Sequence, residues 1–147
     1  FAHHDPKKLE EDGEYHYVDQ GIQELTYTLV PHKNTWKESD IVQIAAVLNQ
    51  KPSTIIETFH KGNLPMKQSF LEVDAKEILV SAMKEAEDGD GIIVRAYETM
   101  RHDTACTIKL PFLERVIKTQ FSPCEIKTFK IPYDKSAEVI EVNMLEM

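Results

Sequence analysis

A series of short apolar segments rich in β-branched residues begins at Ile78 and continues almost to the end of the chain. Turn-forming residues separate these segments at a spacing of about ten residues, which is typical of antiparallel β-sandwiches. The sequence therefore predicts an all-β fold built as an antiparallel β-sandwich. The predicted strands are ILVSAMKEA, GIIVRAYETM, ACTIKL, EIKTFKI and AEVIEVNM, while residues 112–121 could form a helical turn or another strand.

The first half of the chain is more mixed. Residues 21–32 alternate between apolar and polar side chains and predict a half-buried strand. Residues 39–49 instead place apolar side chains at helical spacing behind a possible N-cap, which predicts one short helix. Residues 53–60 and 69–74 predict two further strands, separated by a Gly-Asn-Leu-Pro break.

The charge and hydropathy of the chain argue against two classes of partner. Its 147 residues carry 17 basic and 25 acidic side chains, which gives a formal net charge of −8. Binding to a phosphate backbone needs a basic surface, so we expect no nucleic-acid partner. No apolar run approaches the ~18 residues of a membrane helix, so we expect no membrane partner. The sequence opens on Phe1 without a signal peptide, so we expect a piece of a longer polypeptide.

Cys106 and Cys124 are the two cysteines of the chain. Two cysteines are too few for a disulfide framework, although a bond between them stays open. We expect two reduced thiols and therefore a cytoplasmic location. Neither cysteine has an identifiable base, so we expect no catalytic thiol.

The acidic stretch KEAEDGDGIIV joins two predicted strands through residues 87–91. Asp and Gly tolerate the positive φ angles that hairpin turns require, so turn geometry alone explains why they cluster here. The spacing does not match a calcium-binding EF-hand loop, which places a distal Glu after its glycine. The sequence therefore predicts a structural turn rather than an ion site.

A few other residues suggest chemistry. His3, His4 and Asp5 could bind a metal, but adjacent histidines are more often solvated, and neither HExxH nor paired Cys/His spacing supports them. No GxSxG motif or Gly-rich phosphate loop occurs. His32 and Trp36 flank a loop that could face a sugar, although packing on the end of the sheet is the commoner role.

Three scattered carboxylates complete the candidates. Glu72, Asp74 and Glu98 could form an acid–base pair only if the fold brings two of them into one cleft. From the residues alone, the sequence predicts an all-β module without a recognisable active site. Two functions stay open, a structural sandwich within a larger enzyme and an independent carbohydrate- or protein-binding domain.

Three stretches together resemble the C-terminal region of glycoside hydrolase family 38, the α-mannosidases, in the bacterial type. They are YVDQGIQELTYTLVPHKNTW, LVSAMKEAEDGDGIIVRAYE and PCEIKTFKI. The long central motif is the most specific, and the resemblance covers about residues 15 to 131. The matching residues are Asp19, Gly21, Tyr27, Leu29, Pro31, His32, Ser81, Lys84, Ala86, Glu87, Asp88, Gly89, Asp90, Gly91, Val94, Arg95, Tyr97, Glu98, Glu125, Ile126 and Thr128.

This resemblance implies where the chemistry of the parent enzyme lies. Members of the family are zinc-dependent retaining exo-α-mannosidases, with an aspartate nucleophile and the zinc in an N-terminal catalytic domain. Those motifs are absent from this sequence, so we expect no catalytic residue and no cofactor or metal in this chain, with zinc in the parent catalytic domain. The expected partners are the preceding domains of the same polypeptide and, through the parent enzyme, mannosides.

The resemblance also implies a domain organisation and a role. Residues 1–147 would form one β-rich C-terminal unit, with a possible seam near 60–68 that divides the end of a middle β-region (1–65) from a terminal β-sandwich (66–147). The predicted function is that of a non-catalytic fragment of an enzyme that hydrolyses terminal α-mannosides, with a structural or domain-docking role. The alternative is an independent carbohydrate-binding sandwich.

The two strands beside the acidic turn are apolar on both faces, whereas a solvated outer face would be mostly polar. We assign one face to the core, and an arginine on the other face should find a carboxylate or backbone carbonyls. That second face would be covered by residues 1–65 or by the preceding domains of the parent enzyme. The core face carries Ile78, Val80, Ala82, Ile92, Val94 and Ala96; the other carries Ser81 and the possible docking residues Leu79, Met83, Ile93, Arg95 and Tyr97.

Overall fold

The computed structural model describes residues 21–147 of the chain. The chain divides into two compact units, residues 1–31 and residues 32–147. Of the first unit, residues 21–31 are described, and they form neither helix nor strand. His3, His4 and Asp5, weighed above as possible metal ligands, lie outside the described residues.

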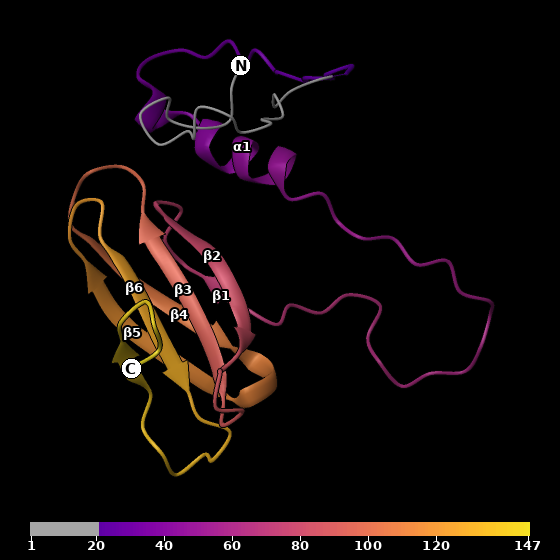
Figure 1. Cartoon of the computed structure of the whole chain (residues 1–147), viewed down its shortest axis with the longest axis vertical. Helices are drawn as coiled ribbons and strands as arrows, with labels where there is room; N and C mark the ends of the chain where they lie inside the picture. Colours follow the sequence, from indigo (N-terminus) through magenta and orange to yellow (C-terminus); the bar gives the residue numbers. More distant parts are fainter. Residues whose placement is uncertain (1–20) are drawn as a thin grey trace, which may run out of the picture. The chain divides into compact units, whose positions relative to one another are not determined.

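The second unit contains a β-sandwich of two antiparallel sheets and one short α-helix (Figure 1). One sheet has the strand order β2-β3-β6-β7, and the other has the order β1-β4-β5. This confirms the predicted all-β class, and the helix confirms the prediction over 39–49. The elements are η2 (Trp36–Glu38), α1 (Ile41–Asn49), β1 (Glu72–Val73), β2 (Ile78–Glu85), β3 (Ile92–Glu98), β4 (Thr104–Leu110), η3 (Pro111–Leu113), β5 (Arg115–Phe121), β6 (Ile126–Ile131) and β7 (Ile140–Val142).

The hydrophobic core lies between the two sheets. In β4, alternate side chains are buried because a strand turns successive residues to opposite faces. The sequence does not decide between a helical turn and a strand for residues 112–121. The structure shows a single 3₁₀ turn followed by strand β5. Glu114, with φ of 57°, separates the two. The buried core cluster is Ile78, Val94, Ala96, Cys106, Ile108, Leu110, Ile117, Phe121, Phe129 and Ile131.

A β-bulge in β2 changes the predicted faces of that strand. Val80 pairs with Ala96 and Ala82 pairs with Arg95, so the register shifts at Ser81. Beyond the shift, the side chains of β2 point to the opposite faces from those that strict alternation predicts. The core-face prediction for Ala82 is therefore wrong, because Ala82 lies opposite Arg95 on the outer face. Met83 lies opposite the core residue Val94, but it is outside the core cluster and 40% exposed, so its docking role stays a prediction.

Two predicted strands do not form. Residues 21–31 and 53–60 have no regular secondary structure, and their large apolar side chains are exposed, Tyr27 by 86%. Alternation predicts a strand only where a partner strand completes the hydrogen-bond ladder, and no described residue pairs with either segment. Of the strand predicted over 69–74, only the two residues of β1 pair.

Among residues 21–147, no helix is long and apolar enough to cross a membrane. The segment between α1 and β1 is drawn in magenta in Figure 1 as a long connection without helix or strand. The seam predicted near 60–68 falls in this connection, and it stays a prediction.

Candidate functional site

The outer face of the four-stranded sheet carries most of the residues that the sequence singles out. We define this face by three rows of paired residues that point away from the core, using the strand register. All three rows cross β2, β3 and β6 in that order. The turn row is Lys84, Ile93 and Lys130, the middle row is Ala82, Arg95 and Thr128, and the loop row is Leu79, Tyr97 and Ile126.

The C-terminal segment Asn143–Met147 returns to the turn row. Glu146 accepts a hydrogen bond from the backbone N–H of Glu87 at 3.0 Å, and its carboxylate lies 2.6 Å from Lys84 Nζ. The Asn143 side-chain oxygen accepts hydrogen bonds from the N–H groups of Leu145 and Met147, which fixes the local turn. The ion pair lowers the pKa of Glu146 and raises that of Lys84. The segment is therefore tied to β2 and to the acidic turn.

Arg95 connects the middle row to the same segment. Its Nε donates to the Thr128 hydroxyl at 3.0 Å, and its Nη2 donates to the Met144 carbonyl at 2.9 Å. Thr128 is buried beneath it. The guanidinium thus finds a hydroxyl and a backbone carbonyl within this chain, which answers why an arginine lies in an otherwise apolar strand.

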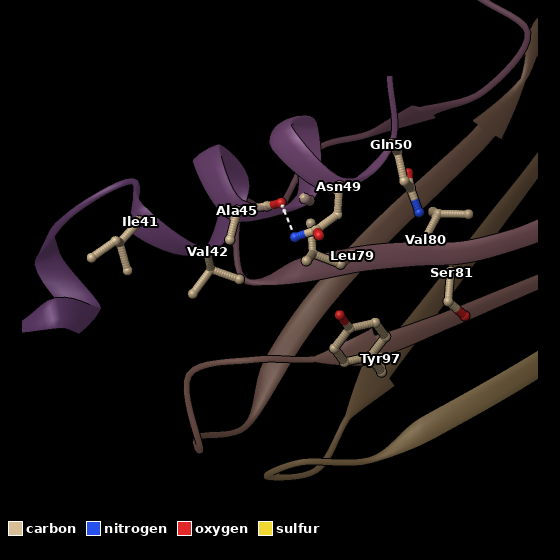
Figure 2. Close-up of a pocket in the computed structure, with 10 residues that line it drawn as sticks. Ile41, Val42, Ala45, Asn49, Gln50, Leu79, Val80, Ser81 and Tyr97 are labelled. Atoms are coloured by element: carbon tan, nitrogen blue, oxygen red, sulfur yellow. Dashed lines mark hydrogen bonds between the residues drawn. The ribbon is translucent and has the colours of Figure 1, made fainter. Parts of the chain in front are cut away.

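The loop row faces helix α1 across a cavity of about 550 Å³ (Figure 2). Leu79 and Tyr97 line the cavity from the sheet, while Ile41, Val42 and Ala45 line it from the helix. No residue of α1 is fully buried, so the helix covers this row loosely. Ile126, at the β6 end of the row, keeps 53% of its surface exposed.

Gln43 makes a direct hydrogen bond between α1 and the sandwich. Its Nε2 donates to the Lys76 carbonyl, whereas its Oε1 is buried without a hydrogen-bond partner. A buried polar atom without a partner costs free energy, so this anchor holds the helix weakly.

The acidic turn over residues 87–91 forms a hairpin, as the sequence predicts. Asp88 accepts a hydrogen bond from the Asp90 N–H and pairs with Lys130, which lowers the pKa of Asp88. Gly89 and Gly91 both have positive φ, of 72° and 151°. A Cβ on Gly91 would lie 2.4 Å from the carbonyl oxygen of Ile131, so this position also requires glycine for space.

Glu98 is a buried carboxylate that joins two loops. It accepts hydrogen bonds from the backbone N–H groups of Met100 at 2.5 Å, Arg101 at 2.8 Å and Cys124 at 2.8 Å. Burial alone would raise its pKa, but the N–H donors outweigh burial and lower the pKa. Glu98 therefore acts as an ionised anchor for the β3–β4 and β5–β6 connections. No local pattern in the sequence around Glu98 indicates this role.

The other predicted carboxylates do not join Glu98. Asp74 follows β1 in the other sheet, where it accepts a hydrogen bond from the Thr107 N–H at 2.7 Å, and this contact lowers its pKa. Glu72 is exposed on β1. Within residues 21–147, no group of three or more His, Cys, Asp or Glu side chains is arranged to hold a metal ion.

The remaining candidates are dispersed. Trp36 lies in η2 and is 40% exposed, with Lys37 Nζ at 5.8 Å from its ring centroid, while His32 is exposed and contacts the Lys33 carbonyl. Cys106 and Cys124 are both free thiols, the first buried and the second exposed. Burial and, secondarily, the nearby Asp74 charge raise the pKa of Cys106 to about 11. That shift suits an inert core residue.

Comparison with known proteins gives two similarities and one negative result. The family model "Glycosyl hydrolases family 38 C-terminal beta sandwich domain" matches residues 77–129, which run from the start of β2 into β6. "Alpha-mannosidase G" from Dictyostelium discoideum is 26% identical over 141 residues, an alignment that covers 76% of this chain and 12% of that protein. No solved structure matches the chain. The sandwich is thus similar to the C-terminal β-sandwich domain of family 38 glycosyl hydrolases.

Proposed function

We propose that this chain is the C-terminal part of a family 38 α-mannosidase, and that its sandwich is a non-catalytic structural domain of that enzyme. The observation that carries the proposal is the family match over residues 77–129, which falls on five of the seven strands found in residues 21–147. The relative with mannosidase in its name is about eight times longer than the aligned stretch, because the alignment spans 12% of it. The activity of the whole enzyme is accordingly part of the proposal.

The contacts of the central motif support a structural role. Gly91 allows the hairpin to approach the backbone of Ile131 closely. Arg95 donates a hydrogen bond to the C-terminal segment, and Glu98 accepts hydrogen bonds from two loops. Each of these residues is engaged within the fold rather than aimed into a cleft. We therefore interpret the motif as one that specifies the sandwich and not as a reaction site.

The parent enzyme, in this proposal, is a zinc-dependent retaining hydrolase of terminal α-mannosides. The described residues 21–147 do not fit a zinc site, because no three potential ligands come together in them. We place the zinc, the nucleophile and the acid/base in the preceding catalytic domain. The bacterial type and a reducing, cytoplasmic location stay predictions, the second supported by two free thiols.

The sandwich would also dock on the preceding domains of the same polypeptide. The loop row supports this, because Leu79 and Tyr97 line an unfilled cavity and Ile126 is half exposed. Further apolar side chains are exposed in residues 21–31 and 53–60, which have no partner among the described residues. Ile93 leaves the proposed docking face because it has no exposed surface, whereas Met83 pairs with a core residue but keeps 40% of its own surface exposed.

Activity of the chain and of the full polypeptide on an aryl α-mannoside tests the proposal. We expect turnover and stoichiometric zinc only for the full polypeptide. Residues 21–147 bring together neither a catalytic pair of carboxylates nor a group of metal ligands. Zinc-dependent turnover by the chain alone would overturn the structural role. Mannose titration of the isolated chain, followed by the fluorescence of Trp36, its single tryptophan, tests the alternative of a carbohydrate-binding module, with His32→Ala as the comparison variant that keeps the signal.

A further inference from the structure

Ile93 has an unusual environment for an outer-face residue. It points away from the core, between Lys84 and Lys130 in the turn row, yet it has 0% of its surface exposed. Lys130 supplies part of the cover, because it keeps only 14% of its side chain exposed and lysine stems pack on apolar surface. Lys84 keeps 41% of its side chain exposed, so its side of Ile93 needs a further part of the chain to exclude water.

The C-terminal segment is the part of the described chain that reaches this place. Glu146 contacts Lys84 and the Glu87 N–H on one side, and the Met144 carbonyl contacts Arg95 on the other. Ile93 pairs directly with Lys84 and is two residues from Arg95 on the same face of β3. Both contacts of the segment therefore lie on immediate neighbours of Ile93, which places the segment beside that residue.

The segment is held by polar groups and not by its apolar side chains. The Glu146 side chain is only 9% exposed, whereas Met144, Leu145 and Met147 are all largely exposed. Its backbone is already ordered by Asn143, so closing the segment loses less conformational entropy than closing a flexible one.

We propose that Asn143–Met147 is a strap that closes over Ile93 and is latched by the Glu146 carboxylate. Without the latch, the strap opens while the sandwich stays folded. Opening uncovers an apolar spot beside Lys84, Arg95 and Lys130. It separates Lys84 from the Glu146 carboxylate and Arg95 from the Met144 carbonyl, while Lys130 stays paired with Asp88 of the acidic turn.

Thiol labelling of Ile93→Cys in the 147-residue chain tests this strap. The background is Cys124→Ser, which removes the exposed thiol, and the buried Cys106 then reports global unfolding in the same sample. Adding Glu146→Gln should speed labelling of the thiol at position 93 about tenfold and leave Cys106 slow. Glu141→Gln is the matched control, because Glu141 pairs with Lys127 on the same sheet and does not touch the strap.

Two results would overturn the strap. If Glu146→Gln and deletion of residues 143–147 both leave the labelling rate at position 93 unchanged, the segment does not cover Ile93. If Cys106 and the thiol at position 93 speed up together, the latch holds the whole fold and not a strap. Should Ile93→Cys fail to fold, hydrogen exchange of the Glu87 amide replaces the label, because its N–H donates to Glu146. That amide should exchange about tenfold faster in Glu146→Gln alone, and an unchanged rate would contradict the latch.

Discussion

At the scale of single residues, the central motif specifies backbone geometry. Gly89 and Gly91 are two residues apart and both have positive φ, but their surroundings differ. A Cβ on Gly89 would meet open space, whereas one on Gly91 would meet the Ile131 carbonyl oxygen and carbon. Turn sterics account for the first glycine, and a close approach between the hairpin and β6 accounts for the second.

We expect Gly91→Ala to lower the free energy of unfolding by about 3 kcal/mol, since it combines an unfavourable φ with a backbone clash. Gly89→Ala, the matched control, should cost about 1 kcal/mol from φ alone. Urea denaturation of both variants gives the comparison. Equal losses at the two positions would show that the contact with Ile131 is unimportant.

Glu98 shows how a charged side chain can stabilise a loop from inside the fold. Its folded-state pKa is lowered, so its stabilisation is present above the unfolded pKa of about 4.3 and is lost as the pH falls through the folded value. We expect Glu98→Gln to cost about 2 kcal/mol at neutral pH, because hydrogen bonds to a charged acceptor are lost.

The cost of Glu98→Gln should shrink as the pH falls below the unfolded pKa of about 4.3 and through the lowered pKa of the folded carboxylate. Denaturation midpoints over a series of pH values from neutral to acid measure this change. The exposed Glu72→Gln is the control and should show no comparable change. A cost for Glu98→Gln that does not depend on pH would mean that Glu98 is not ionised in the folded chain.

At the scale of elements, local pattern predicted most of the strands and missed what depends on distant contacts. Strands β2 to β6 form where apolar segments bounded by turn residues predict them. Helix α1 forms where the apolar residues have helical spacing. The bulge at Ser81 left no local signal, and it moved Ala82 and Met83 to faces that alternation does not predict.

The candidate site depends even more on distant contacts. Glu146 and Glu87 are 59 residues apart in the chain, so no periodicity could place the C-terminal segment on the outer face. Residues 21–31 are the opposite case. Their alternation is clear, but alternation describes a side-chain arrangement that becomes a strand only beside a partner.

At the scale of the whole molecule, the outer face divides into a part that is covered within the chain and a part that is not. The strap lies at the turn and middle rows, and α1 faces the loop row across the cavity. The docking proposal therefore concentrates on Leu79, Tyr97 and Ile126. In that proposal, these residues would supply a small apolar surface for the preceding domains.

We expect Leu79→Lys with Tyr97→Ser to change the unfolding free energy of the isolated chain by less than about 1 kcal/mol. In the full polypeptide, the same pair should cost about 2 kcal/mol, because it removes two apolar contacts of an interface. Thermal denaturation of the isolated chain and of the full polypeptide measures the two stability changes, and mannosidase activity of the full polypeptide is measured alongside. Val116→Lys on the other sheet is the control. Unfolding of the isolated chain by the double substitution would show that α1 already buries this row.

The bulge in β2 also affects how the sandwich meets copies of itself. β2 is an edge strand of eight residues, and a long regular edge is a template on which another chain can add a strand. The opposite edge, β7, has only three residues, and the other sheet ends in the two-residue β1 and the seven-residue β5. By breaking the regular series of N–H and C=O groups at Ser81, the bulge protects the longest open edge of the four-stranded sheet from edge-to-edge aggregation.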